Sequence, residues 1–137
     1  MVTEGHGIPL GVVVAAANQN DSTLLEETLD SRVVQPPIHE EFKQNLCLDK
    51  GYDTLAMPDR VEAKGLIPHI RTRGEERRQK KRKRGFRARR WVVERTHAWI
   101  NRFDKLFIRR EKKAENYLGL VHLACAVITL RSCEVFE

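Results

Sequence analysis

The sequence predicts an α/β fold in which short strands carry flanking helices and two helices end the chain. In the first half, short β-branched apolar runs alternate with amphipathic segments, as expected when helices cover a sheet. In the second half, two longer segments place apolar residues at helical spacing. A length of 137 residues and a hydrophobic fraction of 41% suit a single domain with its own core.

The first expected strand is the apolar run from Leu10 to Ala16. A helix should follow it, because Thr23 and Glu26 have the spacing of a capping box. Asp21 is also interpreted as a helix-capping residue. We expect this helix to end near Val34, before two consecutive prolines.

The second expected strand, Asn45 to Leu48, delivers Asp49 at its C-terminal end. In open α/β sheets, ligands and catalytic groups collect at that edge. A helix should then reach Lys64, with Gly65 as its C-terminal stop. Leu66 to Ile70 should form a third short strand.

Two helices are expected in the last third of the chain, one from about Arg89 to Phe103 and one from about Lys112 to Leu130. The first has a polar stripe beside its apolar one. The members of that polar stripe are Arg90, Glu94, His97 and Asn101. Glu94 is therefore expected on a solvated face among bases. The last helix should be a largely buried packing element.

Positive charge is concentrated between Arg71 and Arg90. This basic block holds twelve of the 25 Lys and Arg residues and two of the 19 acids, so its charge is +10 in a chain of net charge +6. The rest of the chain sums to −4. This concentration of positive charge in the basic block predicts binding to a polyanionic partner. A solvated loop or a localisation signal is the alternative interpretation.

Several classes of function lack sequence support. No Gly-rich phosphate loop or nucleophile elbow is present. Cys47, Cys125 and Cys133 include no CxxC pair, and we interpret them as reduced core or near-core thiols. The five histidines lack metal-ligand spacing. No apolar run approaches the ~20 residues that cross a bilayer, and the N-terminus does not resemble a signal peptide, so a cytoplasmic protein is expected.

The candidate catalytic groups are carboxylates. Asp49 and Glu94 lie 45 residues apart and flank the basic block. Two such hard oxygen ligands can hold Mg²⁺ or Mn²⁺, and a pair of these ions activates the nucleophile and stabilises the leaving oxygen in phosphoryl transfer. The alternative is structural: Asp49 caps the following turn, and Glu94 pairs with Arg90 or His97.

The order of these motifs resembles the C-terminal part of DDE transposases of the IS-five group of bacterial insertion sequences, within the IS-four-like superfamily. The resemblance spans nearly the whole chain and rests on GIPLGVVVAAANQNDSTLLEETLD, LCLDKGYD, IPHI, the basic block, and RWVVERTHAWINRFDKLFIRREKKAENYLGLVHLACAVITLR. It implies a ribonuclease-H-like domain with a short mixed sheet. In that fold two Asp and one Glu gather around divalent metal, Mg²⁺ or Mn²⁺.

The resemblance assigns roles to individual residues. Asp49 in LDKGYD is similar to the family's second catalytic Asp, and Glu94 in RWVVERT is similar to the catalytic Glu; both would be metal ligands. Arg90 matches an Arg that contacts DNA phosphate. The residues expected to bind DNA are Arg77, Arg78, Lys80, Lys81, Arg82, Lys83, Arg84, Arg87, Arg89 and Arg90.

The chain departs from the family pattern at its start. The family's first catalytic Asp lies on an upstream strand, and MVTEGHGIPL offers no counterpart. Glu4 falls in the next strand or its turn. Arg87 stands where the family's Glu signature has Tyr, and Asn101 stands where it has Lys. We therefore expect residues 1–137 to be one N-terminally truncated catalytic domain, or the second of two reading frames joined by frameshifting.

Two functions follow from the resemblance. The first is DNA transposition by metal-dependent strand cleavage and strand transfer, at insertion-sequence ends and target DNA, with an upstream-frame product completing the site. With one carboxylate missing, this chain alone should not cut DNA. The second is a catalytically inactive DNA-binding remnant or regulator. Both functions imply double-stranded DNA as the partner and no membrane. Both are compatible with a homodimer on DNA and with a nucleoid-associated location in a bacterial cytoplasm.

Overall fold

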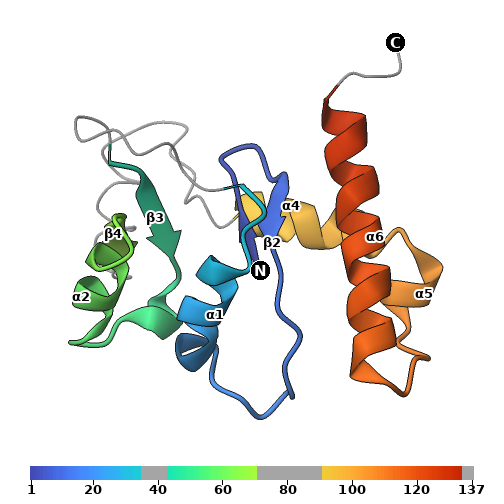
Figure 1. Ribbon diagram of the computed structural model, residues 1–137, viewed down its shortest axis with the longest axis horizontal. Coiled ribbons are helices and arrows are strands. Elements are labelled where there is room, and N and C mark those ends of the chain that lie inside the picture. The colour runs from blue at the N-terminus through green and yellow to red at the C-terminus, as the bar shows by residue number, and fades with distance from the viewer. Residues whose placement is uncertain (35–42, 71–90, 134–137) are drawn as a thin grey trace, which may run out of the picture. The chain divides into compact units, whose positions relative to one another are not determined.

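The computed structural model describes residues 1–34, 43–70 and 91–133 (Figure 1). The chain divides into two compact units, and each is described by itself. The hairpin unit comprises Met1–Gln19, Glu27–Val34 and Val92–Glu137. The parallel-sheet unit comprises Asn20–Glu26 and Gln35–Trp91. The basic block at 71–90 lies outside the described residues.

The hairpin unit begins with two short antiparallel strands, β1 (Val2–Thr3) and β2 (Pro9–Gly11). Glu4 lies in the turn that joins them, in agreement with the sequence prediction. The predicted strand from Leu10 to Ala16 is too long, because the chain leaves the ladder after Gly11. Val12 packs instead against the core cluster of this unit. The run after Gly11 therefore contributes to the core and does not extend the hairpin.

The first helical segment consists of a 3₁₀ turn, η1 (Asp21–Leu24), and α1 (Leu25–Asp30). It ends four residues before the predicted limit at Val34. The predicted capping box and the capping role of Asp21 are wrong. The cap is Asn20, whose Oδ1 accepts hydrogen bonds from the backbone N–H and the hydroxyl of Ser22, both at 3.0 Å. An amide side chain at this position satisfies an amide of the first turn that lacks a partner within the helix.

The parallel-sheet unit is built on β3 (Asn45–Leu48) and β4 (Ile67–Ile70), which pair in parallel register. Between them lie the 3₁₀ turn η2 (Lys50–Tyr52) and α2 (Met57–Glu62). Both strands and the helix between them confirm the sequence prediction. Pro58 stands in the first turn of α2, where no amide is needed, and Gly65 follows the helix with φ of +74°.

Contacts within this unit join α2 to η1 and to the start of α1. Met57 and Val61 are completely buried on one side of α2. Arg60 precedes Val61 in α2. Its Nε donates a hydrogen bond to Glu26 Oε1 at 2.8 Å, and its Nη1 donates to the Ser22 carbonyl oxygen at 3.2 Å. One guanidinium therefore links two segments that lie more than thirty residues apart in the sequence.

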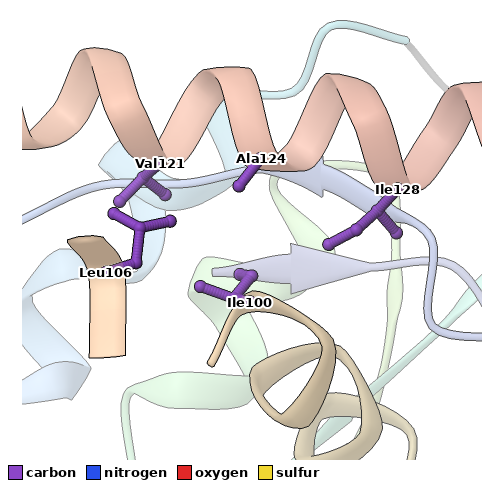
Figure 2. Packing of buried hydrophobic residues seen from close by; sticks show 5 residues of the cluster. All are labelled: Ile100, Leu106, Val121, Ala124 and Ile128. Atoms are coloured by element: carbon purple, nitrogen blue, oxygen red, sulfur yellow. The ribbon is translucent and has the colours of Figure 1, made fainter. Parts of the chain in front are cut away.

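Three further helices belong to the C-terminal third of the chain: α4 (Trp91–Ile100), α5 (Asp104–Phe107) and α6 (Ala114–Ser132). α4 and α6 confirm the two predicted helices, and α5 was not predicted. Figure 2 shows the core of the hairpin unit, where three side chains of α6 point toward Ile100 and Leu106. Those three are Val121, Ala124 and Ile128.

The predicted burial of α6 and of the cysteines needs correction. Leu123 and Leu130 of α6 are 62% and 44% exposed, so this helix buries one face and leaves apolar residues on another. Cys47 and Cys133 are exposed free thiols, and only Cys125 is half-buried.

The mixture of helices and short sheets agrees with the predicted α/β class. Within the described ranges, however, the strands form two separate two-stranded sheets, one antiparallel and one parallel, in place of the single short mixed sheet that was predicted. In the same ranges, no helix is both long enough and apolar enough to cross a membrane.

Candidate active-site residues

Asp49 lies at the C-terminal edge of the parallel strand pair, directly after β3. Its side chain is exposed, and its Oδ1 accepts a hydrogen bond from the Gly51 backbone N–H at 2.8 Å. A Cβ at position 51 would approach that oxygen to 3.0 Å, so glycine permits the tight turn. The structural role considered for Asp49, capping the following turn, is therefore confirmed.

That turn uses only one of the two carboxylate oxygens. Within the described part of the chain, Oδ1 has its partner in Gly51, and no hydrogen bond to Oδ2 is present. A carboxylate fixed through one oxygen and exposed to solvent keeps lone pairs for a cation. Capping the turn and binding a metal ion are therefore compatible roles for Asp49.

The charge of Asp49 acts on its neighbour Tyr52. Burial of the phenol raises the pKa of Tyr52, and the negative charges of Asp21 and Asp49 raise it further. Tyr52 is half-buried and stays protonated at neutral pH.

Glu94 lies in the first turn of α4, on the exposed side of that helix. His97 and Asn101 are exposed as well, which confirms this part of the predicted polar stripe. Desolvation of the imidazole by neighbouring atoms lowers the pKa of His97, although the residue is exposed as a whole, and the positive N-terminus lowers it further, so the imidazole is mostly neutral at pH 7. No ion pair of Glu94 is present within the described residues, so the alternative pairing with His97 is not found, and Arg90, the other alternative partner, lies outside them.

The opposite side of α4 is fixed by a buried polar contact. Thr96 is fully buried, and its hydroxyl lies 2.5 Å from the Gly7 carbonyl oxygen and 3.2 Å from that of Val92. Gly7 has φ of +93°, and a Cβ there would lie 3.2 Å from the Thr96 hydroxyl oxygen and 3.3 Å from the Val92 carbonyl oxygen. The hairpin turn therefore sits directly on the helix that carries Glu94.

The turn itself is held together by Glu4. Its Oε1 accepts hydrogen bonds from the backbone amides of His6 (2.7 Å) and Ile8 (2.9 Å), and its Oε2 lies 3.0 Å from His6 Nδ1. Burial by itself would raise the pKa of Glu4, but these hydrogen bonds outweigh it and hold the pKa below its ordinary value. Arg95 adds a contact from α4, because its Nη1 donates to the His6 carbonyl at 3.2 Å.

The sequence prediction missed Gly7 and Thr96. A signal for Thr96 exists, because Val92, Thr96 and Ile100 repeat every four residues along the apolar stripe. A threonine in such a stripe is buried and needs a carbonyl partner. No comparable signal in the sequence identifies Gly7 as that partner.

The two predicted carboxylates belong to different units: Asp49 to the parallel-sheet unit and Glu94 to the hairpin unit. Both are exposed and offer hard oxygen atoms, the ligand type that Mg²⁺ and Mn²⁺ prefer. Among the residues that the structure describes, no group of three or more His, Cys, Asp or Glu gathers as a metal site. The chemistry of the donors thus fits a divalent ion, although two carboxylates do not complete a site. All ten bases predicted to bind DNA lie in the basic block, outside those residues.

Comparison with known proteins places the chain in a family. A family model described as Transposase DDE domain matches residues 46–131, a region that contains both Asp49 and Glu94. A protein from Burkholderia cepacia, named as a transposase for insertion sequence element IS402, is 33% identical over 143 aligned positions. The match covers 98% of this chain and 64% of that relative. No solved structure gives a significant match. The chain therefore belongs to the family of transposases with a DDE domain.

Proposed function

We propose that this chain contributes two carboxylates, Asp49 and Glu94, to the metal centre of a DNA transposase of the IS-five group with a ribonuclease-H-like catalytic domain. The observation that carries the proposal is the position of Asp49. It follows a parallel strand within the family-matched region 46–131, at the sheet edge where α/β folds collect catalytic groups. The motif resemblance around Glu94 supports the second assignment.

The chemistry assigned to these residues is positioning and charge. Asp49, held by its turn, and Glu94, held by its helix, would bind and orient Mg²⁺ or Mn²⁺ through exposed carboxylate oxygens. Such ions, when bound, activate a water or 3′-hydroxyl and stabilise the leaving oxygen in phosphoryl transfer. The bases of the block at 71–90 would hold DNA phosphates.

Binding of Mn²⁺ by the purified chain, followed by the loss of the free-ion EPR signal, tests the metal-ligand assignment. We expect Asp49→Asn and Glu94→Gln each to weaken binding about 10-fold or more, because each removes a charged oxygen ligand. The matched controls are Asp59→Asn and Glu115→Gln, which remove exposed acids from the first turns of α2 and α6. Equal effects of the site variants and the controls would contradict the assignment.

A cleavage assay separates the two functions. The family's first Asp has no assigned counterpart in these 137 residues, so we expect the chain by itself to bind element-end duplex DNA without cutting it. Addition of a polypeptide that carries the strand with the family's first Asp should give cleavage, and Glu94→Gln should abolish it. A chain that never cuts under these conditions acts as the DNA-binding remnant or regulator. Cleavage by the chain alone, sensitive to Glu94→Gln, would show that the site is already complete.

A further inference from the structure

A second basic segment lies in the hairpin unit, outside the block at 71–90. Residues 102–113 contain six bases and two acids, a charge of +4. With the +10 of the basic block, this leaves −8 on the remainder of a chain whose net charge is +6. The six bases are all exposed, and they are Arg102, Lys105, Arg109, Arg110, Lys112 and Lys113. We call residues 102–113 the α5 surface.

The α5 surface is anchored to the core of its unit. Leu106 is 6% exposed and lies against Val121 of α6 (Figure 2). Farther along, the Arg109 guanidinium lies over the Tyr117 ring, 4.9 Å from its centroid, and Arg109 Nε donates to the Glu111 carbonyl at 3.3 Å. The segment is therefore fixed in the middle and near its end, so that its charges have defined positions.

Among the residues that the structure describes, the side chains of the other five bases of this surface make no hydrogen bond or ion pair. Within the described ranges, the acids of the segment, Asp104 and Glu111, make no ion pair with them, and the ion pairs present involve Glu4 and Glu26. Like charges gathered on one short segment repel one another unless an anion lies between them. A bound polyanion would relieve that repulsion.

Two apolar side chains stand among these charges. Phe107 is 67% exposed and Ile108 is 54% exposed, although their neighbour Leu106 is buried. Proteins that bind DNA place apolar side chains against bases or between base steps while cations hold the flanking phosphates. An aromatic ring within a basic segment matches that combination.

We propose that the α5 surface is a second DNA-contact surface, in which its exposed bases bind backbone phosphates and Phe107 packs against a base. The choice of DNA as the polyanion rests on the proposed function. The charge on this surface would add to that of the 71–90 block, so the chain would hold DNA at two places. An anionic membrane is the competing polyanion, and the experiment below includes it.

The test measures the affinity of the full chain for a labelled DNA duplex over a series of salt concentrations. Arg110→Ala/Lys112→Ala removes two positive charges from the α5 surface. The matched control, Lys43→Ala/Arg131→Ala, removes two exposed positive charges from elsewhere in the described residues. We expect the slope of log affinity against log salt to fall by about 1.8 in the first variant and to stay unchanged in the control, because each phosphate contact contributes about 0.9.

A second pair of variants isolates the apolar contact. Phe107→Ala should weaken binding about 5-fold or more with an unchanged salt slope, because no charge is removed. The control is Leu123→Ala, an apolar residue of similar exposure on α6. The conservative variant Arg110→Lys/Lys112→Arg should keep the parent slope, which distinguishes loss of charge from disturbed folding.

The outcomes separate the two proposals. Failure of the parent chain to bind DNA would overturn both of them. A parent chain that binds DNA, with equal slopes for Arg110→Ala/Lys112→Ala and its control, would overturn the α5 surface alone. Binding to vesicles rich in phosphatidylserine that depends on Arg110 and Lys112, without a change in the DNA slope, would overturn it in favour of a membrane.

Discussion

The two candidate catalytic carboxylates are held in place by different means. Asp49 is fixed within three residues, through its own hydrogen bond to the Gly51 amide. Glu94 depends on long-range contacts, because its helix is braced by a hairpin turn 89 residues earlier in the sequence, through Thr96 and Gly7. A turn held by its own hydrogen bond keeps its geometry when distant residues are substituted. A helix positioned by a distant hairpin turn can shift when that hairpin turn is changed. The position of Glu94 should therefore be the more fragile of the two.

The largest effect is expected from Gly7→Ala. A Cβ at this position meets Thr96 and the Val92 carbonyl at 3.2 and 3.3 Å, and φ of +93° disfavours alanine in any case. We expect a loss of about 2 kcal/mol in the free energy of unfolding by urea. Gly5→Ala is the control, since nothing lies within 4 Å of its Cβ. Equal losses in the two variants would show that the hairpin does not brace α4.

Thr96→Val should have the next largest effect. The substitution keeps the shape of the side chain and removes the hydroxyl that donates to the Gly7 carbonyl. A buried carbonyl that loses its partner costs about 1 to 2 kcal/mol, measurable in the same urea experiment. Thr96→Ser, which keeps the hydroxyl, should retain more of the stability than Thr96→Val. The reverse order would show that the methyl group is the important part of this side chain.

Acid should weaken the hairpin turn that Glu4 holds together. Hydrogen bonds hold the pKa of Glu4 below its ordinary value of 4.5. The folded state therefore binds a proton less readily than the unfolded state, and the stabilisation, complete above pH 4.5, is lost as the pH falls through the lowered pKa. Amide exchange of residues 4–8 should accelerate in that range. In Glu4→Gln, the amide-exchange rates of residues 4–8 should not show this acceleration in acid. The same acceleration in Glu4→Gln as in the parent chain would contradict the role given to Glu4.

The smallest effect on stability is expected from Asp49→Asn. The amide oxygen of asparagine can still accept the hydrogen bond from Gly51, so the turn survives. We expect the free energy of unfolding to change by less than about 0.5 kcal/mol, although the substitution weakens the proposed metal ligand. A loss comparable to that of Thr96→Val would mean that Asp49 serves folding more than metal binding.

This contrast also explains how far the sequence predicted the structure. β3, Asp49 at its end, β4, and Gly65 as the stop of α2 were all predicted, because each depends on residues a few positions apart. The exposed side of α4 was predicted for the same reason, since a polar stripe is a local pattern.

The predictions were wrong or incomplete where contacts between residues far apart in the sequence determine the local structure. The strand predicted from Leu10 to Ala16 stops at Gly11, because Val12 packs against the cluster that α6 forms about a hundred residues later. Gly7 was missed because its partner, Thr96, lies 89 residues later in the sequence. α5 was missed because four residues are too few for a periodic signal.

The central proposal is that Asp49 and Glu94 contribute ligands to one metal centre, and paramagnetic broadening by Mn²⁺ in the ¹⁵N-labelled chain tests it most directly. We predict that the amide signals at 49–51 and at 92–95 broaden at the same Mn²⁺ concentration, and that Glu94→Gln weakens the broadening at both places. Broadening near only one of the carboxylates, or broadening at 49–51 that is unchanged in Glu94→Gln, would contradict the claim.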